Sequence, residues 1–248
     1  MGTGPLCPCP GSRETLSYVK SRARVPDRQD AGSESKGSRM EIPRNRIYLV
    51  RHGQTASNRD RIVMGKRDEP LSEEGIVQAQ SLSTALGGLS WDAAFSSDLE
   101  RAHHTARIVV GERDLEIALL PGLAEQDYGD WEGLSFEELR KRHPSDALTL
   151  LTDPALIRIP GGEGFDEFKD RVIGTYEEKI RTDERNRDVL IVAHGGAIRI
   201  LVCYFLGLEY SRNFFKLWVS NGSLTVVDEL MPGTALLKRL NWTADGAD

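Results

Sequence analysis

Two short apolar runs, each followed at once by a histidine or an Arg-His pair, constrain this sequence more than any other feature. Residues 47–50 are Ile-Tyr-Leu-Val and precede Arg51-His52, while residues 189–193 are Val-Leu-Ile-Val-Ala and precede His194. A continuous apolar run of this length, bounded by polar residues, predicts a strand that is buried on both faces. Such strands belong to parallel sheets whose two faces are covered by helices. We therefore expect an α/β domain.

The periodicity of the remaining chain fits such a domain. Apolar residues at helical spacing predict helices at about residues 72–87, 98–109, 136–142, 165–176 and 196–205. Ser72 and Asp98 are the expected N-caps of the first two helices. Further short strands are expected at about 93–95 and 115–120, and Asn221-Gly222 is expected to join strands 214–219 and 223–228 in a hairpin. Strands that alternate with helices imply a three-layer α/β/α sandwich around a largely parallel sheet.

The regular pattern does not cover the whole chain. Residues 1–40 are rich in Gly, Pro, Ser and Arg and show neither helical nor strand periodicity, so we predict a disordered N-terminal extension. An alternative is that Met40 is the true start of the protein. The folded domain is expected over residues 41–240, followed by a short C-terminal tail at 241–248.

Composition excludes several classes of function. The net charge of −6 argues against non-specific binding to nucleic acid. No apolar run approaches the roughly 20 residues that cross a bilayer, so no membrane partner is expected. The three cysteines form no disulfide framework, and Cys203 lies in an apolar run that predicts a core position. A reducing cytoplasm fits this cysteine usage best.

Unusual polar residues follow three of the predicted strands. In a parallel sheet, ligands bind beyond the carboxyl ends of the strands. The residues that stand there are Arg51 and His52 after the first strand, Ser96, Ser97 and Arg101 after the second, and His194, Gly195 and Gly196 after the apolar strand 189–193. Arginine binds phosphate oxygens in bidentate fashion, and helix N-termini favour negative charge. The pattern predicts a phosphate-binding site.

A histidine in such a site is a candidate nucleophile. The surrounding cations disfavour protonation of the imidazole, so a neutral ring nitrogen is available to attack phosphorus. The same cations would neutralise the oxygens of the transferring phosphoryl group. The departing alkoxide also needs a proton, and Glu125 is our candidate donor. Asp127, Asp130 and Glu132 lie in the same predicted loop and are the alternatives.

Five motifs follow one another over about residues 46–228: Arg51-His52-Gly53-x-Thr55-x-x-Asn58, Pro70-Leu71-Ser72-x-x-Gly75, Ser96-Ser97-x-Leu99-x-Arg101-Ala102-x-x-Thr105-Ala106, Leu123-x-Glu125-x-x-Tyr128-Gly129-x-Trp131-Glu132-Gly133 and Ala193-His194-Gly195-Gly196. In kind and in order they resemble the motifs of the histidine phosphatase (phosphoglycerate mutase-like) superfamily. Each motif is weak by itself, but five in order are highly specific. In style the sequence is closest to small-substrate phosphatases such as α-ribazole phosphatase.

The resemblance implies a role for each matching residue. His52 would be the residue that is phosphorylated, and Glu125 would be the general acid and then the general base for water. The catalytic set would be completed by Arg51, Arg101 and His194. The substrate-binding residues would be Arg51, Gln54, Thr55, Asn58, Arg101, Tyr128 and Gly195. The family implies neither a metal nor a cofactor.

The sequence favours a phosphatase over the other readings of this family. Mutases of the family usually carry Trp before the motif's Asn, whereas this chain has Ser57, and its Pro160-Gly161-Gly162-Glu163 run resembles small-substrate phosphatases. We expect a small phosphorylated metabolite as substrate. Phosphoglycerate mutase activity, or phosphate binding without catalysis, are the alternatives. A second anionic group on the substrate, met by Arg140, Lys141 or Arg142, and a homodimer both stay open.

Overall fold

The computed structural model describes residues 44–182, 184, 186–244 and 246 of the chain. The predicted extension at 1–40 lies outside the described residues. In the described part, a six-stranded sheet has the strand order β3-β2-β4-β1-β5-β6. The strands are β1 (Asn45–Arg51), β2 (Ala93–Ser96), β3 (Ile117–Leu119), β4 (Asp188–Ala193), β5 (Leu224–Met231) and β6 (Thr234–Trp242).

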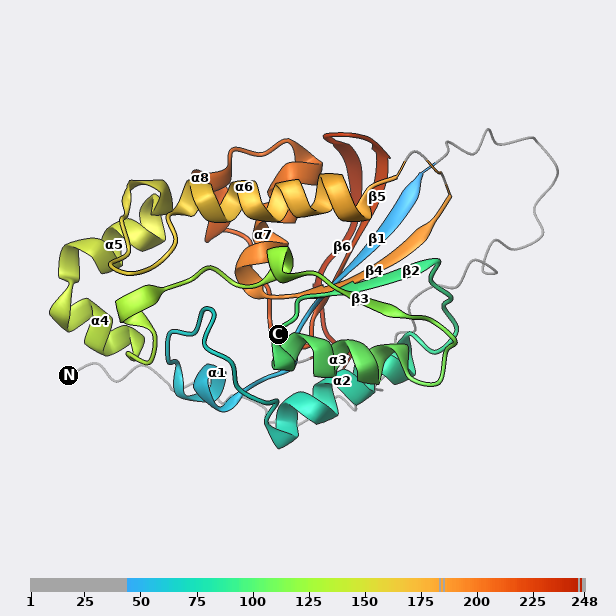
Figure 1. Cartoon of the computed structure of the whole chain (residues 1–248), viewed down its shortest axis with the longest axis horizontal. Coiled ribbons are helices and arrows are strands. Elements are labelled where there is room, and N and C mark those ends of the chain that lie inside the picture. Colours follow the sequence, from blue (N-terminus) through green and yellow to red (C-terminus); the bar gives the residue numbers. More distant parts are fainter. Residues whose placement is uncertain (1–43, 183, 185, 245, 247–248) are drawn as a thin grey trace, which may run out of the picture.

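Helices cover both faces of this sheet (Figure 1). The α-helices are α1 (Ala56–Asp60), α2 (Glu73–Ala85), α3 (Glu100–Val110), α4 (Phe136–Arg142), α5 (Pro144–Thr152), α6 (Phe165–Thr175), α7 (Gly195–Leu206) and α8 (Tyr210–Phe214). Short 3-10 turns occur at η1 (Pro121–Leu123), η2 (Gly129–Trp131) and η3 (Pro154–Leu156), and a π-helical turn, η4 (Tyr176–Ile180), continues α6. In Figure 1, α2 and α3 lie below the sheet, with α6 and α7 above it.

The two apolar runs form the centre of the sheet. Strands β1 and β4 pair in parallel, with Ile47 opposite Val189 and Arg51 opposite Ala193. Their side chains alternate between two cores, because successive residues of a strand point to opposite faces. Leu49 and Ile191 pack towards α6 and α7, whereas the alternating residues pack towards α2 and α3. The expected α/β/α sandwich is confirmed.

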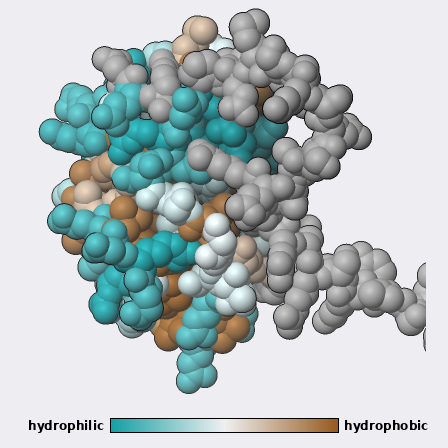
Figure 2. All heavy atoms as spheres, turned by 90° about the vertical axis from the view of Figure 1, so that its right-hand side faces the viewer, coloured by the Kyte–Doolittle hydropathy of each residue, from teal (hydrophilic) through white to brown (hydrophobic). Residues whose placement is uncertain are grey.

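Strand direction fixes where a site can lie. Strands β1, β2, β3 and β4 are mutually parallel, and β5 and β6 add an antiparallel edge. The carboxyl ends of the parallel strands point towards the middle of Figure 1, where α1 and the loops before α4 gather. The opposite end of the molecule faces the viewer in Figure 2 and displays mainly hydrophilic side chains, with smaller hydrophobic patches between them.

The predicted hairpin is wrong in its first half. Residues 214–219 do not form a strand: Phe214 ends helix α8, whose N-cap Glu209 accepts the amides of Ser211 and Arg212. Phe214 is buried against Phe165 with ring centroids 5.2 Å apart. The hairpin that does form joins β5 to β6 through Pro232-Gly233, where Gly233 has φ +66°. Strand β6 reaches Trp242, two residues into the segment expected as a tail.

Two further local predictions have different outcomes. Ser72 is the N-cap of α2, and its side chain accepts the amide of Gly75, as expected. Asp98 does not cap α3, because the helix begins after Leu99 without a side-chain cap of its own. The first turn of the helix is instead capped by Asp68, which lies in a loop distant in sequence and whose carboxylate accepts the Glu100 amide. Cys203 is fully buried, as predicted for the core.

Candidate active site

Three neighbouring strands end beside one another and present their next residues to a common space. Arg51, the last residue of β1, lies opposite Ala193 of β4, and Ser96 of β2 lies opposite Val192. His52 and His194 therefore follow adjacent strands, and their ring centroids are 5.0 Å apart. The prediction that these strand ends meet is confirmed.

His52 is held in one orientation and one tautomer. Its side chain is almost completely buried, and Nδ1 lies 2.7 Å from the carbonyl oxygen of Gly53. A carbonyl can only accept a hydrogen bond, so Nδ1 carries the proton and Nε2 keeps its lone pair. Burial, followed by the charges of Arg101 and Arg51, holds the pKa of His52 well below its ordinary value of 6.5. At neutral pH the imidazole is thus uncharged, as the predicted role of nucleophile requires.

His194 is buried beside His52 and shares its electrostatic environment. Its Nε2 lies 2.9 Å from the hydroxyl of Ser97, and its Nδ1 is buried without a hydrogen-bond partner in the described structure. Burial is the main cause that holds the pKa of His194 well below 6.5, and Arg101 is the next. A buried ring nitrogen without a partner is costly, so a ligand oxygen would satisfy it.

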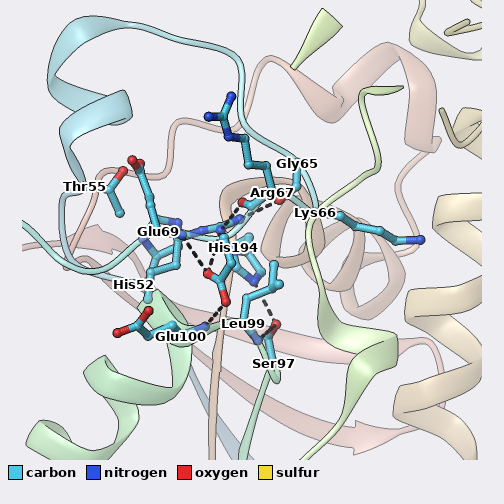
Figure 3. A network of polar contacts seen from close by, with 12 residues as sticks. His52, Thr55, Gly65, Lys66, Arg67, Glu69, Ser97, Leu99, Glu100 and His194 are labelled. Carbon is cyan, nitrogen blue, oxygen red and sulfur yellow. Dashed lines mark hydrogen bonds and ion pairs between the residues drawn. The ribbon is translucent and has the colours of Figure 1, made fainter. Parts of the chain in front are cut away.

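Arg101 lies in the first turn of α3 and bonds to the loop of Gly65 and Arg67, whose residues Figure 3 labels together with His52 and His194. Its guanidinium donates to the carbonyls of Gly65 at 2.7 Å and Arg67 at 2.9 Å, and lies 3.3 Å from the Asp68 carboxylate. Burial lowers the pKa of Arg101, and the nearby acids, Glu125 first, oppose that shift. The loop 65–68 therefore orients this arginine before any anion binds.

Arg51 supplies a second buried cation. Its Nη1 donates to the carbonyl of Val219 at 2.6 Å, while its Nε is buried without a partner in the described structure. Burial, together with the nearby positive charge of Arg199, lowers the pKa of Arg51 to about 10, so it stays charged at neutral pH. Unpartnered Nε of Arg51 and Nδ1 of His194 make the site receptive to an anion.

Asn58 and Thr55 form a capping box at the start of α1. The Asn58 amide donates to Thr55 Oγ1, and Asn58 Oδ1 accepts the Thr55 amide at 3.2 Å. Oδ1 also accepts from the side chain of Asn221 at 2.8 Å. Since both partners of Oδ1 are donors, the amide orientation is fixed and Nδ2 is the donor that Asn58 offers to a ligand.

The remaining predicted substrate-binding residues are Gln54, Gly195 and Tyr128, and each has defined neighbours in the structure. Gln54 is tied to α2, since its amide donates to the Gln78 side chain and its carbonyl accepts from Ser72. Gly195 opens α7 so close to Arg51 that a Cβ there would lie 3.4 Å from the guanidinium Nε. Tyr128 precedes η2, and burial raises its pKa. Contact of these three residues with substrate stays a prediction.

Glu125 reaches the site from the loop after η1. Its Oε2 accepts the amide of Gly196 at 3.0 Å, and its Oε1 accepts the amide of Gln126 at 3.1 Å. Because Gly196 follows His194 by two residues, this bond places the carboxylate beside the two histidines. The close approach requires glycine, since a Cβ on Gly196 would lie 2.2 Å from Oε1.

Two of the alternative acids of this loop have structural duties instead. Glu132 accepts the backbone amides of Lys66 and Arg67, both at 2.9 Å, and so holds the loop that orients Arg101. Asp127 accepts the Gly129 amide at 2.9 Å. These contacts tie Glu132 and Asp127 to the backbone, whereas Glu125 accepts the amide of Gly196 beside the histidines; its role in proton transfer stays a prediction.

Sequence reasoning missed several contacts that build the site. Thr105, a residue of the third motif, accepts the Gly53 amide at 3.0 Å, a contact that the motif alone does not reveal. Arg199 is largely buried near Glu125 and Tyr128, and donates to the carbonyl of Leu217 at 2.8 Å. Its place on α7, five residues after His194, could have suggested a further cation near the site. No sequence signal marks the contact of Asn221 with Asn58, because that contact depends on the fold.

Two features are absent from the described part of the chain. Over the ranges that the structure covers, no three His, Cys, Asp or Glu side chains gather as they would to hold a metal ion. Of the helices in that same part of the chain, none has the length and apolar content needed to span a membrane.

A buried cluster of two arginines, two neutral histidines and a carboxylate, at the carboxyl ends of parallel strands, fits a phosphoryl-transfer enzyme of the α/β class. Comparison with known proteins makes the class specific. The sequence profile of the histidine phosphatase superfamily (branch 1) matches residues 47–243, and the chain belongs to this family. It is a phosphatase of the phosphoglycerate mutase-like fold.

Individual relatives fit this assignment. The chain is 32% identical to the adenosylcobalamin/alpha-ribazole phosphatase of Escherichia coli K12 over 203 residues, which cover 82% of this chain and 98% of the relative. It is 36% identical to a 2,3-bisphosphoglycerate-dependent phosphoglycerate mutase of Parvibaculum lavamentivorans, over 64% of this chain and 78% of the mutase. The crystal structure of a putative alpha-ribazole-5'-P phosphatase from Escherichia coli matches with a TM-score of 0.70 at 32% identity, over 79% of this chain and 96% of that one.

Proposed function

We propose that this protein hydrolyses a small phosphate monoester without a metal, through a phosphohistidine at Nε2 of His52. The observation that carries the proposal is the 2.7 Å bond from Nδ1 of His52 to the Gly53 carbonyl, which leaves Nε2 unprotonated. The lowered pKa of this buried histidine keeps it neutral at the pH where phosphate esters are dianions. Nucleophile and anion can therefore coexist in one pocket.

The first step transfers the phosphoryl group to the enzyme. Nε2 of His52 attacks phosphorus, the ester P–O bond breaks, and the leaving oxygen takes a proton from Glu125. The phosphoryl oxygens accept hydrogen bonds from Arg51, Arg101 and Asn58. They also accept one from His194, whose neutral ring carries its proton on Nδ1. These donors are fixed by protein contacts before the substrate arrives, so little reorganisation is needed in the transition state.

The second step releases phosphate. The Glu125 carboxylate takes a proton from water, the water oxygen attacks phosphorus, and the P–N bond to His52 breaks. Inorganic phosphate leaves, and His52 returns to its neutral state. The same carboxyl thus serves as acid and then as base, which requires that it stay next to the transferring group throughout.

Small phosphorylated metabolites are the proposed substrates, since the relatives include an alpha-ribazole phosphatase and a phosphoserine phosphatase. Mutase activity remains the second candidate because a phosphoglycerate mutase is among the relatives. The basic residues considered for a second anionic group do not favour it. Lys141 and Arg142 are exposed on α4 and pair with Glu137 and Glu138 of the same helix.

Release of inorganic phosphate from a panel of phosphomonoesters, with EDTA present, tests the proposal. We expect wild type to release phosphate and His52→Ala to release none. EDTA-sensitive release, or release undiminished in the variant, would contradict the chemistry. Phosphate that moves between positions of a phosphoglycerate without release would favour the mutase instead.

A further inference from the structure

One side chain outside the loop that carries Glu125 donates hydrogen bonds to three carbonyls of that loop. Arg171, on α6, donates through Nη1 to the carbonyls of Gly122 and Ala124, at 3.0 and 3.1 Å. Its Nη2 donates to the carbonyl of Glu125 itself at 3.2 Å. One guanidinium therefore binds three carbonyls within four residues of backbone, and the last of them belongs to the proposed acid.

Glu163 fixes Arg171 and binds the same loop. It accepts Arg171 Nε and Nη2 in a bidentate pair, both at 2.7 Å. Its backbone carbonyl accepts the side-chain amide of Gln126 at 3.0 Å, and its backbone amide donates to the carbonyl of Asp127 at 2.8 Å. The pair thus clamps the loop on both sides of Glu125, from 122 to 127.

We propose that Arg171, oriented by Glu163, is a positioning residue for proton transfer by Glu125. This inference rests on the proposed role of Glu125 as general acid. The guanidinium of Arg171 donates to the backbone carbonyls of the loop and to Glu163, so it acts through the backbone that carries the acid. A planar guanidinium with fixed donor directions can hold carbonyls and a carboxylate together, and an ammonium group cannot reproduce that fork.

Arg171 has a second way to influence the site, which the experiment must separate. Its positive charge is one of the smaller contributions to the lowered pKa of His194, after burial, Arg101, His52 and Arg51. Arg171→Lys keeps the charge and loses the fork of hydrogen bonds. A role in positioning predicts that lysine fails to replace arginine, whereas a role of charge alone predicts that it succeeds.

A comparison of two substrates measures proton donation to the leaving group. The leaving group of an alkyl phosphate such as glycerol 1-phosphate is an alkoxide, which needs a proton from the acid. The leaving group of p-nitrophenyl phosphate is a stable phenolate, which hardly needs one. The ratio of kcat/KM for these two substrates measures proton donation in the step that forms the phosphohistidine. The ratio does not depend on the concentration of folded enzyme, so a loss of stability does not imitate the effect.

The experiment compares Arg171→Lys, Arg171→Met, Glu163→Gln and Glu125→Gln with wild type. Arg113→Lys is the matched control, because Arg113 also donates to backbone carbonyls, those of Leu86, Leu89, Val109 and Val110, at a distance from the site. We expect the alkyl-to-aryl ratio to fall about tenfold or more in the Arg171 and Glu163 variants, since a misplacement of about 1 Å can cost about 10²-fold. Arg113→Lys should leave the ratio unchanged.

Each failure has a distinct meaning. If Glu125→Gln lowers the ratio but the Arg171 and Glu163 variants do not, the clamp is only structural and the inference is overturned. A wild-type ratio in Arg171→Lys with a lowered one in Arg171→Met would assign the effect to charge and also overturn it. If Glu125→Gln itself leaves the ratio unchanged, the proposed function of Glu125 fails first.

Discussion

Replacement of Gly196 by alanine should separate the chemistry of this enzyme from its stability. A Cβ at this position would lie 2.2 Å from Glu125 Oε1 and 3.1 Å from Phe168 Cζ. Non-bonded carbon contacts are favourable only near 3.5 Å, so Oε1 must retreat by roughly 1 Å. The end of a glutamate side chain moves more easily than the backbone of α7, so the carboxylate should give way.

The retreat removes the bond from the Gly196 amide to Oε2, now 3.0 Å long. A displacement of about 1 Å and the loss of a general acid each correspond to about 10²-fold in rate, or about 2.7 kcal/mol in the activation free energy. The fold should lose little, because Gly196 lies in the first turn of α7 with a backbone that alanine can adopt, and the closest clash falls on the movable end of Glu125.

The assay is kcat/KM for glycerol 1-phosphate and for p-nitrophenyl phosphate, together with thermal unfolding. We expect a loss of about 10²-fold for the alkyl ester, a much smaller loss for the aryl ester, and an unfolding free energy within about 1 kcal/mol of wild type. Gly174→Ala on α6 is the control, since a Cβ there meets no atom within 4 Å. Equal losses on both esters, or none on either, would refute the assignment of Glu125.

Two further predictions follow from the buried charges. Inorganic phosphate at 100 times its Kd should raise the unfolding free energy by about 2.7 kcal/mol, which is about 5–10 °C in Tm for a domain of this size. Potassium chloride of equal ionic strength is the control. An equal gain in Arg101→Met would contradict the proposal that Arg101 binds phosphate. Because the folded-state pKa values of His52 and His194 lie below 6.5, the unfolded chain alone takes up these protons as pH falls through 6.5. The contribution of the two histidines to the unfolding free energy is thus complete above pH 6.5. Below pH 6.5 it declines by at most about 1.4 kcal/mol per pH unit for each histidine. An unfolding free energy that stays constant between about pH 7.5 and 5.5 would refute the burial of both histidines in the neutral form.

The centre of the fold could be read from the sequence because burial there is nearly total. Residues 47–50 and 189–193 are apolar without interruption, and both runs become central strands whose side chains fill two cores. His52 and His194 were predictable as neighbours for the same reason, since adjacent parallel strands that end together bring their next residues together.

The antiparallel edge was harder to predict. Residues 214–219 are as apolar as a strand, but Phe214 and Phe215 serve helix α8 and the packing above the sheet. Strand β6 exposes Leu236, Leu237 and Leu240, so it lacks the alternation of buried and exposed residues that marks a strand. Its position depends on the ladder that it forms with β5, which a single-sequence pattern does not contain.

The support of the site was the least predictable part. Arg171 contacts a backbone 46 to 49 residues away, and Asn221 contacts Asn58 across 163 residues. Such residues have no motif that marks their role, because their function is defined by the loop that they hold. Motifs mark the groups that we propose to contact the phosphoryl group, whereas the contacts that hold those groups in place are visible only in the fold.

The proposed phosphohistidine can be tested by identifying the atom that carries the phosphoryl group during turnover. Wild-type enzyme would be mixed with a phosphate ester and quenched rapidly in alkali, which preserves phosphohistidine, before mass spectrometry and ³¹P NMR. We expect one phosphoryl group on His52, attached to Nε2, with none in His52→Ala. Phosphate on Nδ1, on another residue, or on no residue under turnover would contradict it.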